Sequence, residues 1–249
     1  MGQVVDRVGA LLGAFTHKEP SLSLGDCATR AGLSKSSAHR LLVSLGDIGL
    51  LERDDAGNWQ IGELPLQLAA IRLSHRSVRS EAHKGLARLG EKYLASTAFS
   101  VPNGDQMVYV ERTDSAIPFE PSAKLGSTAP MWAGAAGRAV LSHLDAGDRA
   151  KRCASVEWTA LGPEIRARIG TELDEAARRG YSVDRGEFFD GIAGVAVSLN
   201  RFQTPVAAMS LIMSPERMTK DRERAMGEDL RALAQEIMRC ITLPTEDAE

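Results

Sequence analysis

The stretch from Leu24 to Leu51 constrains the fold more than any other part of the chain, because it predicts two short helices joined by a tight turn. The first helix is expected from about Leu24 to Ala31. Gly32 follows at the position after a helix end where a positive φ is common, and glycine adopts such a φ without steric cost. Ser34 carries a hydroxyl that can accept a hydrogen bond from a free N–H of the next helix, so it is the predicted cap.

The second helix of this pair has one apolar face and one polar face. Four apolar residues recur at helical spacing, namely Ala38, Leu41, Leu42 and Leu45. The opposite face carries small hydroxyls and an arginine, which is typical of the recognition helix of a helix-turn-helix. The side chains suited to phosphates or base edges are Ser34, Lys35, Ser36, Ser37, His39 and Arg40.

A predicted β-hairpin comes directly after this helix. Residues 49–53 end the helix and begin a strand, residues 54–58 are rich in turn formers, and Trp59–Ile61 alternates into a second strand. A hairpin in this place is the wing of a winged helix, and it adds Arg53 and Asn58 to the candidate DNA contacts. The competing interpretation, an ordinary core fragment of two helices and two strands, is disfavoured because several independent signals agree.

Length and charge bound the rest of the chain. Its 249 residues leave room for a second domain after a winged domain. The net charge is −3, and residues 1–80 hold nine Lys and Arg against eight Asp and Glu. We therefore expect DNA binding to depend on the local placement of arginine and on dimerisation rather than on a general basic surface.

Cysteine usage and hydropathy indicate a cytoplasmic protein. The three cysteines lie far apart without metal-binding spacing, so free thiols in a reducing compartment are expected. No apolar run reaches the length of a membrane span, and the N-terminus has no signal-peptide core, so no membrane association is expected.

The chain is expected to divide into a winged helix-turn-helix over residues 1–63, a linker helix with a hinge over 64–79, and a second domain over 80–249. A helix over Gln3–Phe15 should complete the first core. Pro65 fits the first turn of the linker helix, where a missing N–H is harmless. The polar and basic segment His75–Ser80 is the expected hinge.

The second domain reads as a mixture of helices and antiparallel strands. Helices are expected at 82–96, 137–144, 163–179 and 217–241, and strands at 97–102, 106–112, 117–122, 192–199 and 206–213. This mixture predicts an α+β domain, with a curved sheet that has helices on one side.

Several segments, in order and over nearly the whole chain, resemble the IclR family of bacterial transcription regulators. They are the helix-turn-helix stretch, GNWQIG with ELPLQLA, KLGSTAPMWAGAAGRAVLSHL, RRGYSVDRGEFFDGIAGVAV and VAAMSLIMSPERM. The resemblance implies an N-terminal winged helix, a linker helix and a C-terminal GAF-like α+β effector-binding domain. It also implies a homodimer or tetramer that binds double-stranded operator DNA and senses a small organic acid.

The segment 132–138 has mostly small residues at the predicted start of a helix. The free N–H groups at a helix N-terminus can bind an anion. Tight packing through Gly and Ala is the alternative interpretation. Asp184 faces a ligand, or caps its own turn with Glu187 at the start of a short helix, and the two roles are compatible. Ser210 either meets a ligand or a backbone carbonyl. The candidate effector-binding residues are Trp132, Ala135, Ala136, Gly137, Asp184, Ile192, Gly194, Met209 and Ser210.

Three positions depart from the family pattern. Gly186 stands where a second acid is usual, Ile212 replaces one of two serines, and Gly194 stands where a larger side chain is common. Two of these changes, at Ile212 and Gly194, remove polar partners or add room. The hypothesis is therefore an effector bulkier and more apolar than a two- or three-carbon keto acid, namely an aromatic acid.

No catalytic function is expected. The five histidines are not paired with a nucleophile motif, and GxSxG, HExxH, GxGxxG and the Walker A pattern are absent. No metal or cofactor is expected. A hydrolase in the second domain lacks a visible nucleophile and base. The main alternative is a small-molecule-binding signalling module without DNA binding, which a gel shift with the promoter next to its own gene would distinguish.

Overall fold

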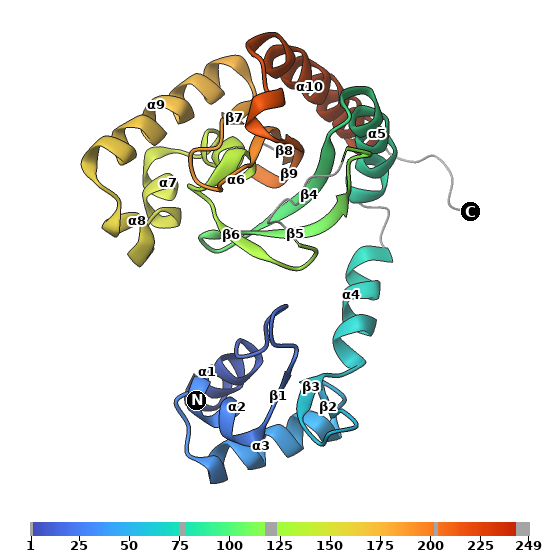
Figure 1. Ribbon diagram of the computed structural model, residues 1–249, viewed down its shortest axis with the longest axis vertical. Coiled ribbons are helices and arrows are strands. Elements are labelled where there is room, and N and C mark those ends of the chain that lie inside the picture. The colour runs from blue at the N-terminus through green and yellow to red at the C-terminus, as the bar shows by residue number, and fades with distance from the viewer. Residues whose placement is uncertain (1, 75–77, 118–123, 202–203, 243–249) are drawn as a thin grey trace. The chain divides into compact units, whose positions relative to one another are not determined.

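The computed structural model describes residues 2–74, 78–117, 124–201 and 204–242, and the chain divides into two units at Ser77/Val78 (Figure 1). Each unit has its own core. The division falls inside the predicted linker segment. The predicted hinge is partly wrong, because Val78 to Ser80 are already helical. Its remaining part, residues 75–77, lies outside the described residues.

The first unit contains helices around a small sheet. Its elements are α1 (Gly2–Leu12), β1 (Ser21–Leu22), α2 (Leu24–Arg30), α3 (Lys35–Asp47), β2 (Leu51–Arg53), β3 (Trp59–Ile61) and α4 (Leu64–Ser74). The sheet is antiparallel in the order β1-β3-β2, and β1 was not predicted because two residues carry no visible alternation. Helix α1 ends three residues earlier than Phe15, just before Gly13.

The turn between α2 and α3 confirms the predicted signals. Gly32 has a φ of 64°, and its N–H donates to the carbonyl of Thr29. The N–H of Leu33 donates to the carbonyl of Ala28 at 2.8 Å, which completes a Schellman cap. Ser34 then accepts a hydrogen bond from the N–H of Ser37 and begins α3.

The core of the first unit comes from α1, α2, α3 and the three short strands, whereas α4 contributes no described residue to it. The α3 stripe packs inward, with Leu41 half-buried and its other three members buried. The fully or nearly fully buried apolar side chains are Leu11, Ala14, Leu22, Cys27, Ala28, Ala38, Leu42, Leu45, Leu51 and Trp59. Because the stripe is buried, the polar side of α3 is left for solvent or a partner.

The second unit is built on one antiparallel sheet in the order β6-β5-β4-β9-β8-β7. The strands are β4 (Ser96–Asn103), β5 (Gln106–Thr113), β6 (Thr128–Pro130), β7 (Ser182–Asp184), β8 (Ala193–Arg201) and β9 (Thr204–Met213). The helices are α5 (Val78–Tyr93), α6 (Gly134–Leu141), α7 (Ala146–Arg152), α8 (Val156–Ala160), α9 (Pro163–Arg179) and α10 (Lys220–Thr242), with a 3₁₀ turn at Pro215–Arg217. The sequence did not predict β6, β7, α7 or α8. The predicted strand at 117–122 lies outside the described residues from 118 onward.

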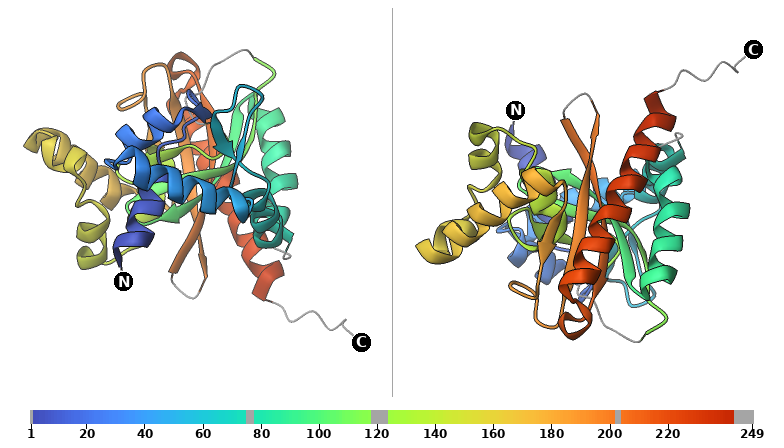
Figure 2. Two further views of the ribbon diagram at one scale, coloured as in Figure 1. Left: turned by 90° about the horizontal axis from the view of Figure 1, so that it is seen from below. Right: turned by 90° about the horizontal axis from the view of Figure 1, so that it is seen from above.

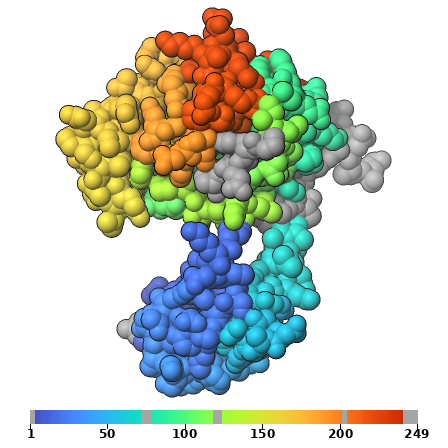
Figure 3. All heavy atoms as spheres, in the orientation of Figure 1, coloured from blue at the N-terminus to red at the C-terminus, as the bar shows by residue number. Residues whose placement is uncertain are grey.

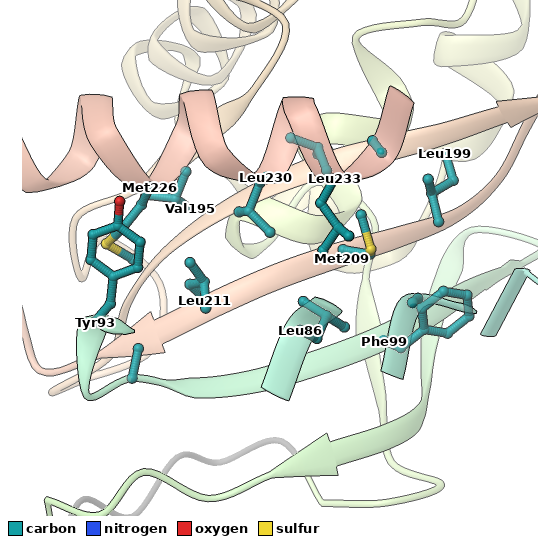
Figure 4. Packing of buried hydrophobic residues seen from close by; sticks show 14 of the residues in the cluster. Leu86, Tyr93, Phe99, Val195, Leu199, Met209, Leu211, Met226, Leu230 and Leu233 are labelled. Atoms are coloured by element: carbon teal, nitrogen blue, oxygen red, sulfur yellow. The ribbon is translucent and has the colours of Figure 1, made fainter. Parts of the chain in front are cut away.

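Helices cover both faces of this sheet, so the expectation of helices on one side is wrong. Helices α5 and α10 run side by side on one face (Figure 2). Successive strand residues point to opposite faces. Val195 and Leu211 therefore join the α5 and α10 core, which includes Leu86 and Leu230 (Figure 4). The other face has small residues such as Ala196 and is covered by α6.

Helix α6 is enclosed by the sheet and by α9, and all eight of its residues are buried. We call the side of the sheet that meets this helix the α6 face. Within the part of the chain that the structure describes, no helix combines the length and apolarity that a membrane span requires. Cys27 and Cys153 are buried free thiols.

Candidate DNA-binding surface and effector site

The start of α3 presents the predicted DNA-contacting side chains to solvent. Ser34, Lys35, Ser36, His39 and Arg40 are exposed, whereas Ser37 is half-buried. The serines are organised among themselves, since Ser34 Oγ lies 3.0 Å from Ser37 Oγ and 3.2 Å from Ser36 Oγ. The hydroxyls therefore form one local polar patch at the N-terminus of the helix.

The cationic side chains on this surface are available to bind a partner. Neither Lys35 nor Arg40 makes an ion pair or side-chain hydrogen bond with another described residue. The only acid on α3 is Asp47, at its last residue. A free guanidinium on an exposed face without acids is able to donate to phosphate or to a guanine edge.

The wing residues have a structural task of their own. The Arg53 guanidinium lies 4.0 Å from the centroid of the Trp59 ring and donates to the carbonyl of Gly57. Asn58 is half-buried, and its N–H donates to Asp54 Oδ1 at 2.8 Å. Both residues thus hold the hairpin together, whatever they contact in DNA.

In the second unit, α6 begins without a side-chain cap. Its cap position is Ala133, and Gly134 starts the helix with a φ of 76°. A Cβ at Gly134 would lie 3.4 Å from the ring of Phe189 and 3.8 Å from Asp184 Oδ2. The start of the helix therefore has free N–H groups, and a carboxylate and an aromatic ring lie beside them.

Arg138 lies in the middle of α6 and is completely buried. Its Nε donates to the carbonyl of Trp132 at 3.1 Å, and its Nη1 donates to Glu187 Oε2 at 3.1 Å and to the carbonyl of Val183 at 3.4 Å. The guanidinium also stacks on Phe188, 4.6 Å from the ring centroid. Its Nη2 is buried and has no hydrogen-bond partner among the described residues.

Asp184 ends β7 on the α6 face, in one row with Gly194 and Ile212 of the next strands. Its Oδ1 accepts from the N–H groups of Gly186 and Glu187 at 3.2 and 3.0 Å. Burial raises the pKa of Asp184, although these N–H groups and Arg138 act in the opposite direction. The interpretation of Asp184 as a turn cap is therefore confirmed, but no helix begins at Glu187.

Two further buried donors lie near α6. Ser100 Oγ and Trp132 Nε1 are both buried, and neither has a hydrogen-bond partner in the part of the chain that the structure describes. Ser100 pairs with Ala208 in the sheet, and Ala208 packs in the same apolar cluster as Trp132. Burial, with a smaller contribution from the Asp184 charge, raises the pKa of Tyr109 to about 12, so its hydroxyl stays neutral at pH 7.

Three predicted effector residues take other roles in the structure. Met209 is wrong as a pocket wall, because it points into the α5 and α10 core (Figure 4). Gly137 serves packing, since a Cβ there would lie 2.1 Å from the carbonyl oxygen of Met131. Gly194 adds no open room, because a Cβ there would lie in ordinary contact, 3.9 Å from Ala135.

The remaining predicted residues lie on or beside the α6 face. Trp132, Ala135 and Ala136 pack in its apolar cluster. Ser210 Oγ donates to the carbonyl of Ala98 at 3.4 Å, which is the backbone alternative of the prediction. Ile192 is half-buried just before β8.

Sequence reasoning missed Arg138, Ser100 and Tyr109 as members of this site. One signal was available for Arg138, because it is the only charged residue in an otherwise small and apolar helix. No local signal distinguishes Ser100 or Tyr109 from other strand residues. Among the described residues, no group of three His, Cys, Asp or Glu side chains could hold a metal ion.

Each of the two units matches a known protein family. The family described as the IclR helix-turn-helix domain matches residues 4–55, and the one described as Bacterial transcriptional regulator IclR C-terminal matches residues 70–239. The HTH-type transcriptional regulator KipR of Bacillus subtilis is 27% identical over 239 residues, which cover 93% of this chain and 94% of KipR.

Solved structures share the fold. An IclR-type regulator from Silicibacter sp. TM1040 superposes with a TM-score of 0.82 at 23% identity, over 98% of this chain and 99% of that one. An IclR homologue from Microbacterium hydrocarbonoxydans, solved with 4-hydroxybenzoate, has a TM-score of 0.78 at 23% identity, over 94% and 96% of the two chains.

Proposed function

Because this chain belongs to the IclR family of bacterial transcriptional regulators, we propose that an aromatic organic acid controls its binding to operator DNA. As a member of this non-enzymatic family, the protein is a DNA-binding regulator with a C-terminal effector-binding domain. We propose effector-binding residues in the second unit and DNA-contacting residues in the first unit.

The observation that carries the proposal is a set of three buried donor atoms around α6 that have no partner among the described residues. They are Arg138 Nη2, Trp132 Nε1 and Ser100 Oγ. A buried donor without a partner costs roughly 1–3 kcal/mol, so a ligand that accepts from these atoms recovers that free energy on binding. A positive guanidinium and an uncapped helix start together favour a carboxylate.

An aromatic body suits the apolar part of the same region. Trp132 packs edge-on against Phe188 with centroids 5.3 Å apart, and Phe189 lies against the start of α6. Asp184 Oδ2 is on the same side and is able to accept a hydrogen bond from a ligand hydroxyl. The relative solved with 4-hydroxybenzoate, which has a ring, a carboxylate and a hydroxyl, supports this assignment.

On the DNA side, we propose that the exposed start of α3 enters the major groove and that the wing contacts the backbone. Arg40 is the proposed base-reading residue, with Lys35 and the serines on phosphates. The family and the weak net charge of the first unit support a dimer that reads a roughly palindromic operator. We propose the functional boundaries 1–63, 64–79 and 80–249 for the DNA-binding, linker and effector segments.

Isothermal titration of the full chain tests the effector assignment. The panel is 4-hydroxybenzoate, benzoate, pyruvate and glyoxylate, followed by a gel shift with the DNA upstream of the gene in the presence of each compound. We expect an aromatic acid to bind and to change the shift. Binding of pyruvate or glyoxylate with no aromatic acid binding would overturn the aromatic assignment while leaving DNA binding intact.

A further inference from the structure

Helices α7, α8 and α9 line an open surface pocket, whose charged residues are not those of the α6 site. These helices form the yellow part of the larger unit in the space-filling view (Figure 3). The pocket has a volume of about 420 Å³, and its lining includes Arg149, Cys153, Trp158, Arg166, Gly170 and Leu173. This volume lies within the range of roughly 300–1,000 Å³ that is usual for small-molecule sites.

The charged residues that line this pocket are both arginines, and neither is fully paired. Among the described residues, Arg149 Nε is buried without a partner, and its Nη2 makes only a long hydrogen bond of 3.4 Å to the carbonyl of Leu144. The ion pair of Arg149 with Asp174 is 3.7 Å long, and the Asp174 side chain is 76% exposed. The Arg166 side chain makes no ion pair or hydrogen bond with any described residue. The pocket is therefore positively charged and has unused donors.

The remaining wall is apolar. Trp158 and Leu173 supply large apolar surfaces, and burial raises the pKa of the Cys153 thiol, so the thiol is neutral at pH 7. Nothing in this wall opposes a negative charge. Since an arginine fork suits a carboxylate and an indole suits a flat ring, the lining favours a molecule that has both.

Gly170 leaves space where a helix normally has a side chain. It lies in the interior of α9, where glycine is less favourable than alanine. A Cβ at Gly170 would meet no atom within 4 Å, so helix packing gives no reason for a glycine there. The absence of a side chain keeps this part of the pocket open.

We propose that this pocket is a second ligand site, which binds an aromatic carboxylate. The carboxylate lies between Arg149 and Arg166, and the ring lies over Gly170 against Trp158. The charged residues of this pocket, Arg149 and Arg166, are not those of the α6 region, and the proposal does not depend on the effector assigned there. Trp158 is also a neighbour of Trp132, with ring centroids 6.1 Å apart, so the two sites share one aromatic wall.

Titration of the full chain with 2-naphthoate, followed by calorimetry, tests the proposal. We expect the affinity of one 2-naphthoate site to fall about tenfold in Arg149→Gln and in Arg166→Gln, because each variant lacks a charged donor. Arg178→Gln is the matched control, since Arg178 is an exposed arginine of the same helix and does not line the pocket. The Asp174→Asn variant should bind 2-naphthoate more tightly, because the carboxylate that competes with the ligand for Arg149 is removed.

Gly170→Leu separates binding from folding. Leucine is a good helix former, and a Cβ at this position meets no atom within 4 Å, so thermal stability should hold or rise while 2-naphthoate binding at this pocket is lost. Cys153 should be alkylated more slowly with 2-naphthoate present, as measured on its peptide by mass spectrometry. Inorganic phosphate should fail to compete, because it lacks the ring. Binding of 2-naphthoate that is absent, or equal in all these variants, would overturn the proposal.

Discussion

Arg138 Nε donates a 3.1 Å hydrogen bond to the backbone carbonyl of Trp132, so a residue within α6 holds the turn that precedes the same helix. The other end of the guanidinium reaches Glu187 and Val183 on a segment about fifty residues later in the chain. One buried side chain therefore ties the start of α6 to the end of β7. Only Nη2 is left over, which is why we assign it to a ligand.

Ser100→Ala should leave the ligand-free protein as stable as before or more stable. Its hydroxyl is buried and has no partner within the described ranges, so its removal relieves a cost of up to about 1–3 kcal/mol. Binding of the aromatic effector should weaken if the hydroxyl donates to it. Ser210→Ala is the matched control, because that hydroxyl already bonds Ala98, and its loss should cost at most about 1 kcal/mol. Urea unfolding measures the stability of the two variants, and calorimetry measures their affinity for the effector. Destabilisation by Ser100→Ala would contradict the assignment of this hydroxyl to a ligand.

Gly137→Ala should disrupt α6, whereas Gly194→Ala should be tolerated. The added methyl at Gly137 would lie 2.1 Å from the Met131 carbonyl oxygen, and overpacking of this kind costs about 1–3 kcal/mol. At Gly194 the contacts begin at 3.4 Å, so the reduced chain entropy of the unfolded state dominates, with a gain of up to about 1 kcal/mol. Thermal unfolding of the two variants should move in opposite directions, and equal shifts would contradict this geometry.

Asp184→Asn should raise stability at neutral pH and lose that gain in acid. Burial raises the pKa of Asp184 in the folded state above its ordinary value of 3.8, so the folded chain holds its proton more tightly than the unfolded chain. Stability therefore falls as pH rises from near 3.8 through the raised pKa, and the penalty stays constant above it. Asparagine keeps the Oδ1 acceptor and removes the charge. Urea midpoints measured from pH 3 to pH 8 check this, and a gain that is the same at both ends would exclude protonation as its cause.

Arg40→Ala should weaken operator binding by about 1–3 kcal/mol, with a loss that depends on the base sequence. The fold should persist, because Arg40 is exposed on α3 opposite the buried stripe. Lys18→Ala is the control, since it removes the same charge from an exposed loop of the same unit. Titration of labelled operator and a scrambled duplex at fixed salt gives the comparison, and equal losses in both variants would exclude base reading by Arg40.

The full chain should sediment as a dimer or larger, and Leu68→Glu should shift it toward monomer. Leu66 and Leu68 of α4 are 70% and 52% exposed, and a second copy is the proposed cover. Val156→Glu is the control, because Val156 is an equally apolar, 81% exposed residue of α8. A wild-type chain that sediments as a monomer at every concentration would contradict the dimer.

The sequence predicted local features well. The Gly32 turn and the Ser34 cap depend on residues within one turn of each other, so their chemistry is visible in the sequence. Met209 was assigned to the pocket together with Ser210, although adjacent strand residues must face opposite sides. That rule would have excluded one of them, but which one is decided by the helices that cover each face.

Features that depend on residues far apart in the sequence could not be predicted from local sequence patterns. The burial of Arg138 depends on Glu187 and Val183, and the row of Asp184, Gly194 and Ile212 depends on the register of three strands. Helices α7 and α8 are short and carry no buried residues, so they have no periodic stripe to detect. The family resemblance supplied the order of the domains, but not which side chains meet.

The six-stranded sheet separates two apolar clusters, one under α5 and α10 and one around α6. Substitutions on opposite sides that share no neighbours are close to additive in free energy. Ligand preference can therefore drift through changes around α6 while the larger cluster under α10 keeps the domain folded. A designer who wants this protein to report a new acid can vary the α6 side alone and leave untouched the odd-numbered residues from 195 to 199 in β8 and from 207 to 213 in β9.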